Sequence, residues 1–302
     1  MKSKTPGACV VDGKELSVTG RFVKTVRVSG GAHVPPPEDP VAFVNQIKRS
    51  GLRADIFTFA QGVNERIPKH AFPSQQLDQM AVLPITTYDD WYTKKLYNKP
   101  RNMLRKALKS GVEIRLEDLN EPLVQGIKAI YDESPIIQGK RNYHYHEDLD
   151  TIRRAHSRYL DRSQFITAHY EGQLVGFAKV TFSEEAGFLI NFASMISHRD
   201  KAVSSALLAK VVEICAERKS RCLVYGVWGS GGTRGLVEFK IANGFECVEV
   251  PRYYVPLTWL GTIALKAGIH QSVVHRMPAW SVEAAAKVRK GWNMFRFKRA
   301  HA

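Results

Sequence analysis

The sequence predicts an α+β protein whose mixed, mostly antiparallel sheet is flanked by helices. Between Val112 and Thr258, segments with strand and helix periodicity follow one another as strand, two helices, three strands, helix, strand, helix and two strands. The 302 residues are 44% apolar and 24% charged, which is ordinary globular composition. We predict three parts: a smaller N-terminal α/β segment (1–110), an α+β domain (111–258) and a basic helical C-terminal tail (259–302).

The N-terminal segment predicts a few strands, one short helix and a long basic helix. Strands are expected at 21–28, 54–59 and 81–86. The first helix should start at the Asp39-Pro40 pair, an N-cap followed by a first-turn proline, and end near Gly51. A longer helical segment is expected from Thr87 to Ser110, kinked or divided at Pro100. From Lys94 to Lys109 it holds seven basic residues and no acidic one.

The domain from residue 111 is read from its periodicity. Strands are predicted at 112–116, 164–170, 174–182, 188–196, 223–228, 246–250 and 253–257. Helices are predicted at 120–131, 147–160 and 200–219, and a short one ends at Asn243-Gly244. The turn Glu171-Gly172-Gln173 between two of the strands indicates a hairpin.

The formal charge of +15 favours an anionic partner: a phosphate-rich cofactor, a nucleic acid or an anionic membrane surface. After Trp259 the tail carries eight basic residues against a lone Glu283. Segments 259–274 and 282–297 are predicted to be amphipathic helices that could lie on an anionic membrane. No apolar run approaches the ~20 residues that cross a bilayer, and Met1 to Asp12 lacks a signal-peptide core. We therefore expect a cytoplasmic protein with a peripheral membrane association through its tail.

One loop carries a family resemblance. His198 to Leu208 follows a predicted strand and opens a helix, and it resembles the Arg/Gln-x-x-Gly-x-Gly/Ala loop of the GCN5-related N-acetyltransferase (GNAT) superfamily. Arg199 matches the basic start, while Ala202 and Ser204 stand where glycines are usual. The resemblance implies an acetyl-CoA or longer acyl-CoA donor, with its pyrophosphate at the amino end of the helix. The residues implied in donor binding are Met195, Arg199, Asp200, Lys201, Ala202, Val203, Ser204 and Ser205.

A second segment, Gly235 to Phe245, resembles the Fem-type aminoacyl transferases, which are built from acetyltransferase-like folds. Ordinary acetyltransferases often carry a general-acid Tyr at the position of Lys240, whereas Fem-type proteins tend to have Lys. The resemblance implies that Lys240 stabilises the oxyanion or protonates the leaving group. It also leaves aminoacyl-tRNA open as the donor, in agreement with the basic helix before Gly111.

The acceptor is expected at the polar and aromatic loop from Glu133 to His146. General bases at neutral pH are His or a desolvated Glu, so Glu133 and His144 are the catalytic candidates. Residues expected to contact the acceptor are Arg141, Tyr143, Tyr145, His146 and Tyr225. The alternative for this loop is an aromatic lid over the core. His144 and His146 alternate along the chain and have no carboxylate or Cys cluster beside them, so no metal is expected.

Three functions remain open from the sequence. The first is an N-acyltransferase that moves an acyl group from acyl-CoA to an amine-bearing acceptor. The second is an aminoacyl-tRNA-dependent transferase of the Fem type. The third is a non-catalytic binding protein on a GNAT scaffold whose tail associates with membranes.

Overall fold

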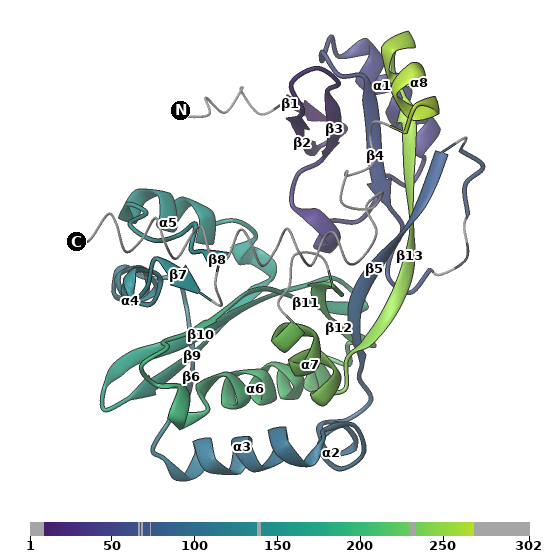
Figure 1. The fold of residues 1–302 in the computed structure, drawn as a ribbon. Helices are drawn as coiled ribbons and strands as arrows, with labels where there is room; N and C mark the ends of the chain where they lie inside the picture. The colour runs from purple at the N-terminus through teal and green to yellow at the C-terminus, as the bar shows by residue number, and fades with distance from the viewer. Residues whose placement is uncertain are drawn as a thin grey trace. The chain divides into compact units, whose positions relative to one another are not determined.

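The structure is a computed structural model, and it describes residues 9–268 except 66, 68, 73, 138–139 and 230–233. The described chain forms two compact units, one made of residues 9–80 with 248–268 and the other of residues 81–247 (Figure 1). The predicted α+β class is confirmed. The units do not divide at residues 110 and 258, because residues 81–110 lie in the second unit and residues 248–258 in the first.

The first unit is a sheet with helices packed on it. Its strand order is β1-β2-β3-β4-β13-β5. The bounds are β1 Cys9–Val11, β2 Lys14–Thr19, β3 Thr25–Val28, β4 Ile56–Ala60, β5 Ser74–Pro84 and β13 Glu246–Pro256, with η1 at Gly31–His33, α1 at Pro40–Arg49 and α8 at Trp259–Lys266. Asp39 starts α1 as predicted, because its carboxylate accepts the N–H groups of Val41 and Ala42 at 2.9 Å.

Strands β5 and β13 contribute to both units and differ from the prediction. The expected strand 81–86 begins earlier, at Ser74, and the two expected strands 246–250 and 253–257 are one strand. Pro251 lies within β13 without interrupting it. Its carbonyl accepts the N–H of Gln61 at 2.9 Å, and the next residue, Arg252, already pairs with Ala60 of β4. A proline lacks only the donor, so a strand can pass through it where that donor is not needed.

The second unit has the strand order β5-β12-β11-β10-β9-β6. Figure 1 shows α3 and α6 on one face of this sheet and α4 and α5 on the other. The bounds are β6 Glu113–Glu117, α4 Glu121–Asp132, α5 Leu149–His156, η3 Leu160–Arg162, β9 Ser163–Tyr170, β10 Gln173–Phe182, β11 Ala186–Ser194, η4 Arg199–Lys201, α6 Val203–Glu217, β12 Cys222–Val227 and α7 Arg234–Ala242. Strands β9 and β10 form the predicted hairpin.

The predicted helix 87–110 is divided. A short turn α2 (Tyr88–Asp90) and a π-helix η2 (Trp91–Lys95) precede α3 (Asn98–Lys109), and Pro100 lies in the first turn of α3, where its missing N–H costs nothing. Trp91 is buried and donates from Nε1 to the carbonyl of Asn243 at 3.0 Å, which fixes the break against the core.

Two further segments refine the prediction. The loop before α5 contains a small hairpin, β7 (Ile136–Ile137) with β8 (Lys140–Arg141). In the tail, α8 ends at Lys266 and Gly268 has a positive φ of 65°, so the helix expected to reach residue 274 stops earlier. The expected helix 282–297 lies outside the described residues. None of the helices in the described chain combines the length and hydrophobicity of a bilayer-spanning segment.

Candidate active site

The central feature of the second unit is a gap between two neighbouring parallel strands. Strands β11 and β12 pair only at Ala186 with Cys222, Gly187 with Leu223 and Phe188 with Val224. Within residues 186–227, all of which the structure describes, no later position joins them. On its other side β11 stays paired with β10 as far as Ser194. From Leu189 to Ser194, the edge of β11 opposite β10 therefore has no partner strand within these residues.

A helix begins just beyond the end of this open edge. After β11 the chain makes the turn η4, and Ala202 then adopts a left-handed conformation (φ 55°) before α6 begins at Val203. The predicted start at Asp200 is therefore three residues early. No side chain caps α6, and the first N–H groups of a helix have no partner within it. The hydroxyls of Ser194 and Ser204 lie 2.9 Å apart and tie the strand end to the first helical turn.

The open edge and the helix end line one cavity of about 570 Å³. The β11 edge contributes Ile190 to Ser194, and the turn and helix contribute Ile196, Arg199 and Ser204. The opposite walls are formed by α4, the loop after it, β12 and α7, through Ile130, Tyr131, Glu133, Ser134, Ile137, Asn142, His144, Tyr225, Gly235, Leu236 and Phe239. The cavity thus connects an exposed strand edge, a helix amino end and a loop that carries titratable groups.

His144 faces this cavity in a defined orientation. Its Nδ1 lies 2.8 Å from the Glu147 carboxylate, and its ring stacks on Tyr131 with centroids 4.4 Å apart. The carboxylate favours the proton on Nδ1, which leaves the lone pair on Nε2. In the described part of the chain, Nε2 makes no hydrogen bond. His144 and Glu147 therefore form an oriented acid–base pair beside the cavity.

Asn142 holds the loop that presents His144. Its amide donates to the carbonyls of Tyr131 and Ser134 at 2.7 and 3.0 Å and accepts the His144 N–H at 3.1 Å. Asn142 and Glu147 are not among the site residues predicted from the sequence. The spacing of three residues between His144 and Glu147 is the pattern in the sequence that indicates their pairing.

Glu133 is engaged by the backbone after β11. Its carboxylate accepts the N–H groups of Ile196 and Ser197, the latter at 2.7 Å. Burial raises the pKa of Glu133, but the hydrogen bonds from Ser197 and Ile196 outweigh it, and the pKa lies below its usual range. A carboxylate held in its charged form by two backbone donors is a weak base. The geometry gives Glu133 the task of fixing the loop between β11 and α6.

Lys240 is deeply buried at one side of the gap. The residue is 2% exposed, its Nζ donates to the carbonyl of Val227 at 2.8 Å, and it lies 4.9 Å from the centre of the Tyr225 ring. Burial lowers the pKa of Lys240 and raises that of Tyr225 to about 12. Tyr225 lines the cavity, so the ammonium group lies behind one of its walls.

Comparison with known proteins agrees with this geometry. Residues 126–228 match the model of the acetyltransferase (GNAT) family. This segment, which contains β11, α6 and β12, is similar to the GNAT family. Comparison with curated proteins gives no match.

Solved structures resemble the chain over more than the GNAT segment. The C-terminal domain of a putative lysylphosphatidylglycerol synthetase from Agrobacterium fabrum has a TM-score of 0.54 at 11% identity, covering 86% of both chains. L-PGS from Bacillus licheniformis has a TM-score of 0.52 at 12% identity, covering 80% of this chain and 81% of the other. FemX has a TM-score of 0.51 at 12% identity, covering 81% and 86%. At these identities the likeness concerns the fold.

Only some of the site residues predicted from the sequence line the cavity. Arg199 and Ser204 line the cavity with Glu133, His144 and Tyr225, whereas the Met195 side chain is buried and contacts Gln173 through its sulfur at 3.8 Å. Lys201 lies against Tyr170, 4.7 Å from its ring centre, and Asp200 is 3.5 Å from Lys201. Residues outside the cavity lining are Asp200, Lys201, Ala202, Val203, Ser205, Arg141, Tyr143, Tyr145 and His146. In the described residues no three metal-ligating side chains gather.

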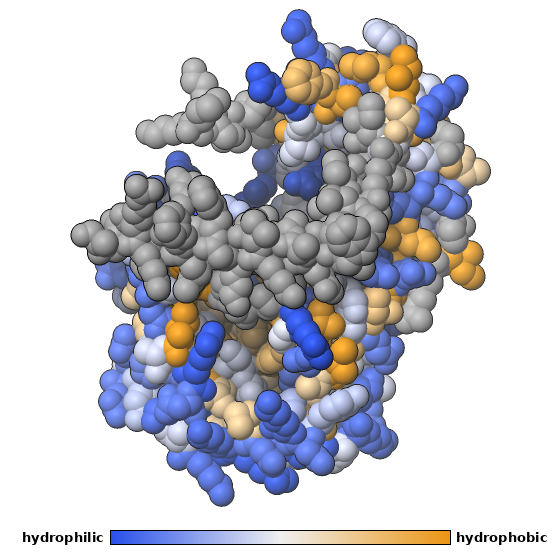
Figure 2. Space-filling model, in the orientation of Figure 1, coloured by the Kyte–Doolittle hydropathy of each residue, from blue (hydrophilic) through white to orange (hydrophobic). Residues whose placement is uncertain are grey.

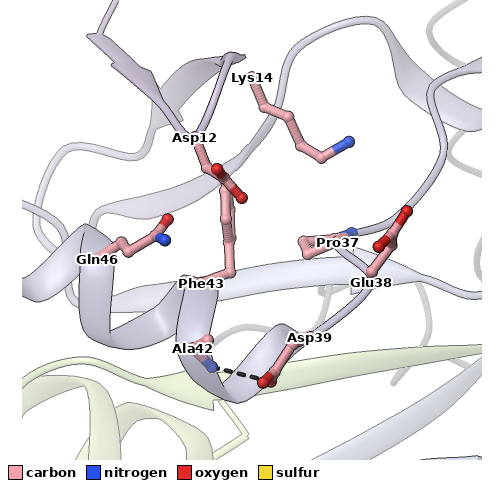
Figure 3. Close-up of a pocket in the computed structure, with 8 residues that line it drawn as sticks. All are labelled: Asp12, Lys14, Pro37, Glu38, Asp39, Ala42, Phe43 and Gln46. Atoms are coloured by element: carbon pink, nitrogen blue, oxygen red, sulfur yellow. Dashed lines mark hydrogen bonds between the residues drawn. The ribbon is translucent and has the colours of Figure 1, made fainter.

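The first unit has a separate cavity of about 340 Å³ beside α1 (Figure 3). Its polar lining includes Asp12, Lys14, Glu38 and Asp39. The Asp39 carboxylate turns toward the start of α1, which it caps, and Lys14 donates to the carbonyl of Pro35 at 3.4 Å. The open edge of β11 and the amino end of α6 line the cavity of the GNAT segment, so that cavity is the candidate active site.

Proposed function

We propose that the second unit is an N-acyltransferase that moves an acyl group from acyl-CoA to an amine. The parting of β11 from β12 after Phe188 and Val224 carries this proposal. Backbone groups on the open edge are available to the acyl carbonyl, and the cavity beside them continues to the amino end of α6. That helix end suits a phosphate because its N–H groups and dipole both favour negative charge.

The donor would lie along the open edge with its phosphates toward Arg199 and Ser204. Arg199 adds a positive charge at the cavity wall, and Ser204 adds a hydroxyl in the first turn of α6. Ala202 takes up the left-handed conformation that glycine adopts more readily, so the loop reaches a tight turn without the glycine usual in the superfamily. These residues fit a phosphate-bearing donor.

The acceptor would enter beside the loop after α4. His144, oriented by Glu147, is the group we assign to receive the proton of the attacking amine. Transfer then forms an amide between the amine nitrogen and the acyl carbon, and the bond between that carbon and the donor sulfur breaks. Lys240 provides positive charge behind Tyr225, which is held protonated, and we assign this pair to stabilise charge on the departing side.

Calorimetric titration with acetyl-CoA and longer acyl-CoA tests the donor, and release of free thiol in the presence of an amine panel tests the transfer. We expect binding to the wild type and thiol release that depends on the amine. Failure of every acyl-CoA to bind would remove the donor assignment. Binding without turnover by any amine would favour a non-catalytic binding protein on this scaffold.

The exposed face of α3 favours a second candidate, transfer from aminoacyl-tRNA. Lys99, Lys106 and Lys109 are exposed and have no ion-pair partner among the described residues, and no acid occurs from residue 93 to 109. Figure 2 shows hydrophilic residues along the lower edge of the second unit, where Figure 1 places α3. The likeness in fold to FemX is in keeping with such a donor.

Filter binding of charged tRNA at increasing salt distinguishes the two donors. A tRNA donor on α3 predicts a steep salt dependence, because each neutralised phosphate releases counterions. The variant Lys99→Glu/Lys106→Glu/Lys109→Glu should then lose binding, whereas the control Lys48→Glu on α1 should keep it. Equal binding by both variants would remove the tRNA candidate and leave the acyl-CoA donor.

A further inference from the structure

The first unit exposes three large apolar side chains on two adjacent segments. Trp259 and Ile263 occupy successive turns of α8 and are 75% and 51% exposed, and Phe22 is 83% exposed in the loop between β2 and β3. Residues four apart lie on the same helix face. Figure 2 shows hydrophobic residues gathered over α8 at the top of the view. We call Phe22, Trp259 and Ile263 the α8 patch.

Asp55 holds the two segments of the patch together. Its carboxylate accepts the N–H of Lys24 at 2.9 Å and the hydroxyl of Thr258 at 2.8 Å. Its carbonyl accepts the N–H of Leu257, also at 2.8 Å. Lys24 follows the Phe22 loop and Thr258 is the N-cap of α8, so a single residue fixes both.

The outward orientation of the patch is set by packing on the opposite face of α8. Ala264 is buried with Ile56 and Tyr254, and Val23 and Leu265 pack against the same cluster. Gly261 contacts the backbone so closely that a Cβ there would lie 1.9 Å from the Asp55 carbonyl oxygen. The helix cannot rotate to bury Trp259 and Ile263 without breaking this contact.

The charges near the patch are basic. Arg21 lies 5.5 Å from the Phe22 ring centre, and Lys266 is exposed on the last turn of α8. The nearby acid Asp55 is already engaged by Lys24 and Thr258. The 36 residues that follow α8 continue this composition: they contain seven Lys or Arg, one Glu and four aromatic residues, Trp280, Trp292, Phe295 and Phe297.

We propose that the α8 patch docks the protein on an anionic phospholipid surface. Trp and Phe favour the boundary between headgroups and acyl chains, because each has a large apolar body and Trp adds a polar N–H. Basic residues beside them attract anionic headgroups. An apolar patch with basic neighbours therefore complements a lipid surface better than an acidic or a purely apolar protein partner. The inference does not depend on the acyltransferase proposal.

Flotation with vesicles of phosphatidylcholine alone, or with about one third phosphatidylglycerol, tests the docking. The full-length chain should bind the anionic vesicles more strongly. The variant Phe22→Ser/Trp259→Ser/Ile263→Ser should lose about tenfold or more in partition coefficient, since apolar burial contributes with charge to such binding. The control Val10→Ser/Leu77→Ser removes two exposed apolar side chains of the same unit and should bind as the wild type does.

Two further measurements test whether a lipid surface or a second copy of the chain covers the α8 patch. Brominated phospholipid should quench wild-type tryptophan fluorescence more than that of Trp259→Phe, which places this residue at the lipid. Equal quenching, or wild-type flotation by the triple variant, overturns the proposal. Gel filtration with light scattering completes the test. A wild-type dimer that the triple substitution converts to a monomer would assign the patch to a second copy and overturn lipid docking.

Discussion

The hydroxyls of Ser194 and Ser204 lie 2.9 Å apart and join the last residue of β11 to the first turn of α6. Both residues line the cavity. Because this bond closes the loop between them, the edge that would hold an acyl carbonyl and the helix end that would hold its phosphates keep a fixed spacing. Glu133 adds two backbone contacts within the same loop.

Ser204→Asp should separate donor binding from stability. A carboxylate in the first turn of α6 suits the helix dipole, so the melting temperature should stay the same or rise. The same charge would repel donor phosphates, and we expect acyl-CoA affinity to fall by about tenfold or more, equivalent to about 1.4 kcal/mol. Asn102→Asp adds an equal charge on α3 outside the cavity and should leave affinity unchanged. Unaltered affinity in Ser204→Asp would place the phosphates elsewhere.

Glu133→Gln should destabilise the loop after β11. Exchanging a charged acceptor for a neutral one should lower the free energy of unfolding by about 1 kcal/mol, a figure reduced for partial exposure. The folded-state pKa lies below the ordinary 4.5, so the stabilisation is complete above pH 4.5 and is lost as the pH falls through the folded value. Urea titrations of both proteins across this range should converge in acid. A difference that persists there would argue against the ionised carboxylate.

Lys240→Met should affect turnover more than folding. Removing the ammonium group behind Tyr225 should lower kcat by about a hundredfold, the scale of a lost charge-stabilising group. The unfolding free energy should change by less than about 2 kcal/mol, because a buried charge and its hydrogen bond disappear together. Lys240→Arg should recover part of kcat. Full activity in Lys240→Met would show that this lysine has only a structural role, through its hydrogen bond to the Val227 carbonyl.

Lys179 provides a matched control with its own pH signature. It is a second buried lysine, it donates to the carbonyls of His156 and Arg158, and burial lowers its pKa from 10.5 to about 8. Between pH 8 and 10.5 the unfolded chain binds more protons at this site, so wild-type stability should rise with pH. Lys179→Met should flatten this rise by an amount on the order of 1–3 kcal/mol and leave kcat unchanged, as denaturant titrations and assays would show. If the stability of the wild type and of Lys179→Met changed with pH by the same amount, the lowered pKa of Lys179 would be contradicted.

Phe192→Ala should change the acyl chain that is preferred. The Phe192 ring lines the cavity and contacts Tyr225 and Phe239 at centroid distances of 5.7 and 6.2 Å. Its removal should raise kcat/KM for longer acyl-CoA relative to acetyl-CoA by about tenfold, since one or two methylene groups are worth that much in a pocket. Phe245→Ala also removes a contact of Tyr225, at 5.9 Å, but lies outside the cavity lining. It should lower stability without changing the preference.

Local patterns predicted several elements of both units well. The Asp39-Pro40 pair located α1, and the apolar spacing from Val203 to Ile214 located α6 to within three residues. The hairpin at Glu171-Gly172 was also found, because two left-handed residues in sequence suit such a turn. In contrast, the single strand β13 was predicted as two strands, 246–250 and 253–257, because sequence alone does not show which N–H groups a neighbouring strand requires.

The site itself was only partly predictable. The place of the loop around Ala202, between a strand and a helix, followed from its family resemblance, but the contacts of Glu133 and His144 did not follow from local patterns. Glu133 contacts Ile196 and Ser197, which lie more than sixty residues later in the chain. Sequence periodicity reports only on neighbouring residues, so it cannot reveal such a contact. The His144 pair with Glu147 needs the turn that Asn142 holds, and this turn is set by carbonyls of Tyr131 and Ser134.

The first unit is assembled from both ends of the described chain, with residues 81–247 inserted between its two pieces. On the ribosome, the described part of the inserted unit is therefore complete before residues 248–268, which hold most of β13 and all of α8, have emerged. Residues 9–80 must wait for that last strand, which pairs with β4 from Arg252 to Pro256. Nascent chains released before residue 248 would carry a folded second unit beside an unfinished first one.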